Sequence, residues 1–364
     1  AQHCARWGPP VVSADLPSGL VADLPGGDQP SFQASRTVVF GAWKPCHVLR
    51  PARERCGRLR LIDLGLTPPP AGLAQIERAD LVQGWPRPAV MADKYARGVV
   101  AVDTGSPAYP GAAVLGVLGA IHAGAGLVKY LGPGRQAVSA AAPNVVCPPP
   151  GPGPRPPGRT ARAGWASGRR RRDDWAAPVR ADAWLIGSGW GRRADGPRRL
   201  AQVLDLGLPT VIDAEAIACF GRWCQAGHQP ASGTVLLTPH AGELARLLQI
   251  TRAEVEADPL SAARAASRRT GTTVLLKGAS QYVVPSAESM VYLCLPGPAW
   301  TAQGGSGDVL AGIAAALLAA GRPPDQAGWL AGSVQALTAA RHPGPHPPQE
   351  LARRLPGIIA ALLE

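Results

Sequence analysis

Residues 303–312 read Gln-Gly-Gly-Ser-Gly-Asp-Val-Leu-Ala-Gly, and an Ala/Leu-rich stretch follows over 313–320. The pattern predicts a glycine-rich loop that opens a helix, where free backbone N–H groups and the positive dipole end bind anions, above all phosphate. The glycines let the backbone approach the phosphate closely. Asp308 stands at the mouth of this loop, where its carboxylate can take a proton from a hydroxyl that attacks phosphorus. The structural alternative is that Asp308 only caps the helix.

Short apolar runs alternate with helix-like segments through most of the chain, and each run ends at a loop with glycine, aspartate or proline. Buried parallel strands have this appearance because both of their faces are covered. The alternation predicts an α/β fold with an open, mostly parallel sheet and helices on both faces, and ligands at the carboxyl ends of the strands. The expected strands are 98–102, 127–131, 183–186, 210–212, 235–237 and 274–276, and the expected helices are 111–123, 195–206, 241–249 and 259–269.

Three of the loops after these strands carry side chains suited to a phosphate-transfer site. His240 follows a strand in Leu-Thr-Pro-His-Ala-Gly-Glu (237–243) and is expected to face the crevice, although a purely structural histidine is the alternative. Asp213 ends another strand, with a helix N-cap as its alternative role. Lys277 precedes a glycine and is suited to contact a nucleotide or phosphate. The glycine-rich loops 187–191 and 105–113 follow further strands.

The length of 364 residues suggests two domains, and the net charge of +12 is concentrated in one place. Residues 151–200 carry 12 arginines and 4 acids, so two thirds of the excess charge lies in one seventh of the chain. Residues 148–157 contain seven prolines in ten positions, which prevents regular helix or sheet. We therefore predict an irregular insertion over 147–180. A solvated basic loop is favoured there over a nucleic-acid surface.

Other sequence features narrow the class of protein. No run of 18 apolar residues is present, which predicts no transmembrane helix and no membrane partner. Residues 1–6 lack an apolar signal core, and the seven cysteines include no C-x-x-C pair, so neither a zinc site nor a disulfide framework is expected. These features favour a reduced, cytoplasmic protein.

Taken in order, the motifs of 91–364 resemble those of the ADP/ATP-dependent NAD(P)H-hydrate dehydratase family, in the ribokinase-like superfamily. The family's glycine-rich loop after the third of these strands contains proline and leucine where this chain has Ser188 and Trp190, and Asn144 stands where the family usually has glutamate. The matching stretches are 93–98 (DKYARG), 105–113, 123–128 (AGAGLV), 187–191, 213–216 (DAEA), 237–243, 277–279 (KGA) and 304–312.

The resemblance implies a ribokinase-like fold and a repair reaction. The family restores the S hydrates of NADH and NADPH (NADHX and NADPHX) by phosphorylating the ring hydroxyl from ADP or ATP, with Mg²⁺, and eliminating phosphate. Asp308 would act as the base, and the amides of Gly305 and Gly307 would hold the transferring phosphoryl group. The implied nucleotide ligands are Lys277, Gly278, Ala279, Ser280, Gln281 and Gly307, and the implied hydrate ligands are Ala112, Ala113, Gly187, Gly189, His240 and Asp308.

The first 66 residues resemble the end of an NAD(P)H-hydrate epimerase domain, a Rossmann-like fold, through Asp-Leu-Pro-Ser-Gly at 15–19. By this resemblance Asp15 would bind substrate and Ser18 a potassium ion. The family's N-N-G-G-D loop is absent from this sequence, so we expect no epimerase activity, and K⁺ only where that site is complete. Residues 67–90, with a helical stretch at 73–82, are expected to be a linker.

Other interpretations of the sequence stay open. A ribokinase-like kinase acting on a vitamin or sugar shares the glycine-rich loop and its aspartate. A degenerate pseudoenzyme would bind nucleotide without dehydrating the hydrate. The composition of 147–180 also suggests the hypothesis of a shifted reading frame. The family resemblance further implies a homo-oligomer.

Overall fold

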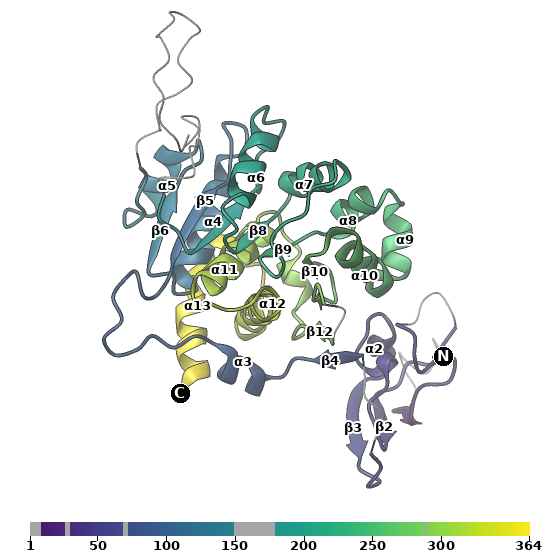
Figure 1. Ribbon diagram of the computed structural model, residues 1–364. Helices are drawn as coiled ribbons and strands as arrows, with labels where there is room; N and C mark the ends of the chain where they lie inside the picture. The colour runs from purple at the N-terminus through teal and green to yellow at the C-terminus, as the bar shows by residue number, and fades with distance from the viewer. Residues whose placement is uncertain (1–8, 26–29, 68–71, 149–178, 288–289) are drawn as a thin grey trace, which may run out of the picture.

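A computed structural model describes residues 9–25, 30–67, 72–148, 179–287 and 290–364 (Figure 1). Within these ranges the chain forms a nine-stranded sheet and a separate three-stranded sheet. Nearly all of the predicted irregular insertion, residues 149–178, lies outside the described residues, and so does its run of arginines. None of the described helices is long and apolar enough to cross a membrane.

The large sheet confirms the predicted open, mostly parallel architecture. Its order is β4-β12-β11-β10-β9-β8-β7-β5-β6, and only β11 runs antiparallel to its neighbours. Every residue of β5, β7, β8 and β9 is buried, which explains why these strands read as continuous apolar runs. The strands are β4 (Leu73–Gln75), β5 (Val99–Asp103), β6 (Leu127–Tyr130), β7 (Ala183–Ile186), β8 (Thr210–Ile212), β9 (Val235–Leu237), β10 (Thr273–Leu276), β11 (Tyr282–Val284) and β12 (Val291–Leu293).

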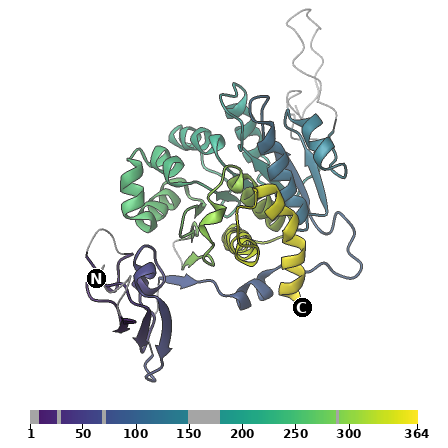
Figure 2. The same cartoon turned by 180° about the vertical axis from the view of Figure 1, so that it is seen from behind.

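Helices cover both faces of this sheet (Figures 1 and 2). Alternate residues of one strand belong to different cores: Val100 and Val102 pack with α4 and α11, whereas Ala101 packs with α6 and α7. Helices α4 and α11 lie so close together that a Cβ on Gly312 would come within 2.0 Å of the Gly116 carbonyl oxygen. One face carries α4 (Pro110–His122), α11 (Ser306–Ala319), α12 (Pro324–Arg341) and α13 (Pro348–Leu363), and the other carries α6 (Gly196–Leu204), α7 (Glu215–Gln225), α8 (Ala241–Leu248) and α10 (Pro259–Thr270).

The segment between the two sheets differs from the expected linker. Leu73–Gln75 forms β4, which pairs in parallel with β12 at the edge of the large sheet. The predicted helix over 73–82 is therefore wrong at its start, and α3 spans Arg78–Gly84. A strand of three residues shows too little alternation to be recognised in sequence, since its pairing partner lies more than 200 residues away.

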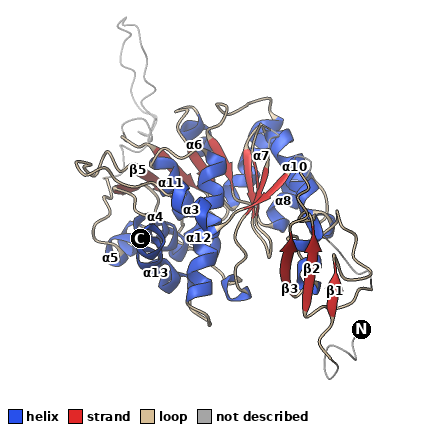
Figure 3. Ribbon diagram, turned by 90° about the horizontal axis from the view of Figure 1, so that it is seen from below, coloured by secondary structure: helices blue, strands red, loops and turns tan. Residues whose placement is uncertain are grey.

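The N-terminal part forms a parallel sheet in the order β1-β2-β3 (Figure 3). This small unit contacts the large one: Leu49 is buried in the core cluster that includes residues of α10, and Arg50 donates a hydrogen bond of 2.8 Å to the Ala279 carbonyl. The elements are β1 (Val12–Ala14), β2 (Arg36–Phe40), the 3₁₀ turn η1 (Pro45–His47), α2 (Ala52–Arg55) and β3 (Arg58–Ile62). The other helical elements among the described residues are α5 (Arg135–Ala141), α9 (Arg252–Ala257) and the 3₁₀ turn η2 (Ala299–Thr301).

Candidate active site

The glycine-rich loop does open a helix. The N-cap of α11 is Gly305, whose φ of 94° is in the left-handed region, and no side chain caps this end. Among the described residues, no backbone carbonyl accepts a hydrogen bond from the N–H of Gly307 or Asp308. Helix α12 supports the loop, because the Gln335 amide donates to the Ser306 carbonyl at 2.8 Å. The start of α11 is thus free to receive an anion, and the alternative role of Asp308 as the helix cap is wrong.

The Asp308 carboxyl lies in a buried and negatively charged environment. Burial raises its pKa to about 7, and Asp213, Glu215 and Glu243 add to the rise, while Lys277 opposes it. A carboxyl with a pKa near neutrality can both accept and release a proton under ordinary conditions, which suits a general base.

Asp213 and Lys277 form a buried ion pair at the carboxyl ends of β8 and β10. The Lys277 ammonium lies 2.8 Å from Asp213 Oδ1 and 4.0 Å from Glu243 Oε2. Thr238 donates to Oδ1 of Asp213 and Ser188 to Oδ2, each at 2.7 Å. Burial alone would lower the pKa of Lys277, but the two carboxylates outweigh it and raise that pKa. Asp213 is not the cap of α7, since Ala214 occupies that position.

The loops expected to hold the hydrate meet near this pair. Gly187 has a φ of 112°, and a Cβ there would lie 2.1 Å from the Asp213 carbonyl oxygen, so only glycine fits. A Cβ on Gly189 would lie 2.5 Å from that of Ala112. Ala113 is fully buried under Gly105. Of the two alanines, only Ala112 reaches the surface between the loops.

His240 has the structural role given as the alternative. It is the N-cap of α8, where its Nδ1 accepts from the Gly242 and Glu243 amides at 3.0 and 3.3 Å. Because Nδ1 is an acceptor, the ring proton is on Nε2, which lies 3.3 Å from Glu243 Oε1. Burial and Lys277 lower the pKa of His240, which favours the neutral ring. About half of the side chain, 54%, remains exposed, so the Nε2 edge can also meet a ligand.

The predicted nucleotide loop, 277–281, connects β10 to β11. Gly278 and Ala279 are exposed, and the Ala279 carbonyl is held by Arg50. The Gln281 backbone carbonyl accepts a hydrogen bond from the Cys294 amide, but its side-chain oxygen is buried and has no hydrogen-bond partner among the described residues. A buried acceptor of this kind is available to a bound ligand. The structure therefore places Lys277 against the carboxylates of Asp213 and Glu243, and the rest of the loop beside it.

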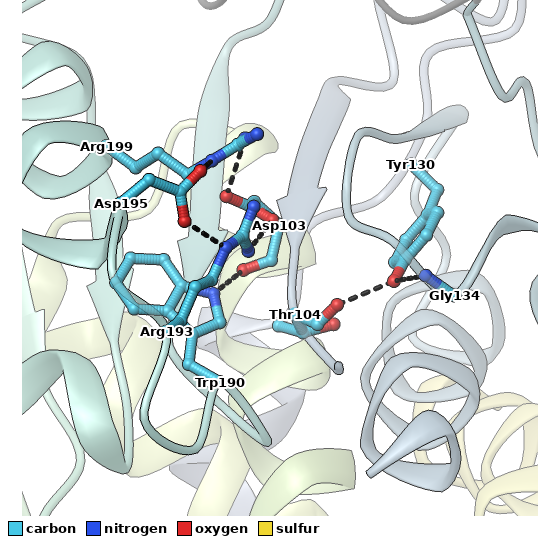
Figure 4. A network of polar contacts seen from close by, with 8 residues as sticks. All are labelled: Asp103, Thr104, Tyr130, Gly134, Trp190, Arg193, Asp195 and Arg199. Carbon is cyan, nitrogen blue, oxygen red and sulfur yellow. Dashed lines mark hydrogen bonds and ion pairs between the residues drawn. The ribbon is translucent and has the colours of Figure 1, made fainter. Parts of the chain in front are cut away.

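Sequence reasoning missed a second buried charge network, at the end of β5 (Figure 4). The Asp103 carboxylate is fully buried and accepts from Arg193 at 2.7 Å and from Arg199 at 3.2 Å. Asp195 holds the same two arginines, and the Trp190 indole donates to the Asp103 carbonyl. The network fixes the loop after β7, in which Gly187 and Gly189 lie. Its only signal in sequence is an aspartate at the end of an apolar run.

Two further observations concern groups that a ligand could meet. In the loop after β5, the Thr104 and Ser106 hydroxyls are buried and have no hydrogen-bond partner in the part of the chain that the structure describes. Within the described ranges no group of three or more His, Cys, Asp and Glu side chains has the arrangement of a metal site. A divalent cation at this site would therefore be held mainly by ligands from outside the protein.

The two residues of the predicted epimerase remnant lie apart from this site. Asp15 follows β1 with a φ of 63°, and its carboxylate accepts from Lys44 at 2.6 Å and from the Phe40 amide at 3.2 Å. Burial alone would raise the pKa of Asp15, but these hydrogen bonds outweigh it and lower that pKa. The Ser18 carbonyl accepts from the Phe32 amide.

The chain is similar to two bifunctional NAD(P)H-hydrate repair enzymes. The one from Mycobacterium leprae is 35% identical over 359 residues, covering 98% of this chain and 69% of the relative. The one from Mycobacterium tuberculosis is 36% identical over 318 residues, covering 87% and 60%. The chain thus spans about two thirds of the length of these relatives.

Two solved structures share the fold. A ribokinase-like superfamily protein from Enterococcus faecalis superimposes with a TM-score of 0.66 at 21% identity, over 82% of this chain and 99% of that one. An ADP/ATP-dependent NAD(P)H-hydrate dehydratase from Bacillus subtilis, co-crystallised with ATP and Mg²⁺, gives 0.64 at 21% identity, over 79% and 97%. The ribokinase-like fold expected from the motifs is confirmed. The family model of NAD(P)H-hydrate dehydratase matches residues 100–359, and the chain belongs to this family.

Proposed function

We propose that this chain dehydrates the S hydrates of NADH and NADPH, with ADP or ATP as phosphoryl donor. The observation that carries the proposal is the meeting of three features at one point. These are the uncapped start of α11, a carboxyl of Asp308 with a pKa of about 7, and the buried Lys277–Asp213 pair. Family membership and the similarity to repair enzymes support it.

The chemistry needs a base, an anion site and a positive charge, and each has a candidate. The Asp308 carboxylate takes the proton of the ring hydroxyl as its oxygen forms a bond to the terminal phosphorus, and the bond from that phosphorus to the leaving nucleotide breaks. The amides of Gly305 and Gly307 face the transferring phosphoryl oxygens. Loss of phosphate and of a ring proton then restores the double bond.

The nucleotide is proposed to lie along 277–281 and Gly307. A Cβ on Gly307 would come within 3.0 Å of the Lys277 ammonium, so the backbone there is close to a positive charge that a phosphate can share. A larger residue would fit there only if the Lys277 ammonium moved by a few tenths of an ångström. Mg²⁺ would be held mainly by nucleotide phosphates and water, which is its usual coordination in such sites.

The hydrate is proposed to lie between the loop after β7 and the start of α8. Gly187, Gly189, Ala112 and the Nε2 edge of His240 would line its site, next to Asp308. The resemblance also supports assigning 1–66 to the end of an epimerase-like domain and 91–364 to the dehydratase domain. The homo-oligomer stays a prediction, which light scattering of the purified chain tests.

A direct assay distinguishes this function from its alternatives. The purified chain is incubated with the S hydrate, Mg²⁺ and ADP or ATP, and recovery of the near-ultraviolet absorbance of the reduced nicotinamide is followed together with phosphate release. The wild-type chain is expected to dehydrate the hydrate, and the Asp308→Asn variant is expected to have no activity. A stable phosphorylated product from a vitamin or sugar would identify a small-molecule kinase instead, and nucleotide binding without turnover would identify a pseudoenzyme.

A further inference from the structure

A cavity of about 360 Å³ lies beside the candidate active site and has no role in the reaction as derived above. It is bounded by the loop after β7, the first turns of α7 and the start of α8. Its lining includes Gly191, Ala214 and Glu243. Gly191 is two positions from Gly189, and Ala214 follows Asp213. The cavity therefore continues outward from the surface proposed to hold the hydrate ring.

The lining is strongly basic. Arg192, Arg193, Arg222 and Arg246 all contribute to it. Arg193 is neutralised by the buried carboxylate of Asp103. The other three are exposed side chains, and none of the ion pairs between described residues includes them.

Two acids also line the cavity, but they do not cancel this charge. Glu243 faces inward: it accepts from the His240 amide at 2.8 Å and lies 4.0 Å from the Lys277 ammonium. Glu215, in the first turn of α7, is the other acid. Three arginines without a carboxylate partner thus face one glutamate that is not already engaged, and the space carries a net positive charge.

A dinucleotide hydrate has the chemistry that such a space would recognise. Its reacting ring is joined through a ribose to a diphosphate, so negative charge must lie a short distance outward from the ring. The planar guanidinium fork binds phosphate oxygens in pairs, with charge-assisted hydrogen bonds. Resting on the function proposed above, we propose that Arg192, Arg222 and Arg246 bind the diphosphate bridge shared by NADHX and NADPHX.

The test compares the double variant Arg222→Gln/Arg246→Gln with the wild type. Arg341→Gln, at the exposed end of α12 and outside the cavity, removes a surface arginine as a control. The double variant is expected to raise the KM for NADHX and for NADPHX by about tenfold, with kcat within about twofold, because the contacts are made with the ground state as well as the transition state. The KM for ADP is expected to be unchanged, and lysine at both positions to restore part of the affinity.

A substrate without phosphate gives the decisive comparison. For the hydrate of reduced nicotinamide riboside, the wild type and the double variant are expected to have the same kcat/KM. An equal loss with this substrate, an unchanged KM for both dinucleotide hydrates, or a rise confined to NADPHX would each overturn the diphosphate assignment. If the wild type dehydrates none of these compounds, the proposed function fails. Binding of NADH, measured by its fluorescence, still tests the arginines in that case. About tenfold weaker binding in the double variant is expected, and equal binding would refute their role.

Discussion

Replacing Asp308 with asparagine is expected to abolish activity and, at alkaline pH, to stabilise the fold. The carboxyl has a pKa of about 7 in the folded protein against an ordinary value of 3.8, first because it is buried and then because Asp213 is close. A group whose pKa is raised by folding binds its proton more tightly in the folded state. Its contribution to stability is complete below pH 3.8 and is lost as the pH rises to about 7.

The size of the effect follows from the same two values. The difference is about three pH units at ~1.4 kcal/mol each, so the ionised carboxyl costs the fold at most about 4 kcal/mol. Asparagine does not titrate and avoids this cost. Urea unfolding of Asp308→Asn and wild type is expected to show a difference in unfolding free energy that grows from near zero at about pH 4 to roughly 2–4 kcal/mol at about pH 8.

The control for this experiment is Asp205→Asn, which removes an exposed carboxylate at the C-cap of α6. It is expected to shift stability by less than about 0.5 kcal/mol at either pH. A pH-independent difference for Asp308→Asn, or retention of full dehydratase activity, would refute the reasoning that one buried carboxyl both serves as base and strains the fold.

Three other substitutions test the surrounding geometry. Gly305→Ala is expected to lose activity and about 1–3 kcal/mol of unfolding free energy, because the φ of Gly305 is 94° and a Cβ there would clash with a leucine of α4. The dehydratase assay and thermal unfolding measure the two effects. Lys277→Met leaves Asp213 buried without its cation and is expected to cost about 3–5 kcal/mol in urea unfolding, more than any exposed lysine variant. Arg193→Met is expected to cost about 2–3 kcal/mol, because a second arginine still pairs with Asp103; an unchanged melting temperature would contradict a structural role for the network.

The charged and polar site residues that sequence located share one property: each lies in a loop after an apolar strand or in the first turn of an apolar helix. Asp213 and Lys277 directly follow β8 and β10, His240 follows β9 by three positions, and the ends of parallel strands meet at one edge. Their meeting therefore followed from strand order alone. Asp308 was found because the glycines before it mark the start of α11.

The features that sequence did not show depend on contacts between distant segments. Asp103 pairs with arginines 90 and 96 positions away, and no local pattern reports such a partner. The same is true of the basic cavity, where arginines from the loop after β7, from α7 and from α8 meet only through tertiary packing. In the sequence Arg222 and Arg246 belong to ordinary polar helix faces, and Arg192 lies in a loop.

The serine that replaces the usual proline in the loop after β7 connects these observations. Proline has no side-chain donor, whereas the fully buried Ser188 hydroxyl donates a hydrogen bond of 2.7 Å to Asp213 Oδ2. Asp213 thus accepts hydrogen bonds from three donors, Ser188, Thr238 and Lys277. The negative charge of Asp213 is the second cause, after burial, of the raised pKa of Asp308. This departure from the family pattern thus acts, through Asp213, on the electrostatics around Asp308, the base proposed above.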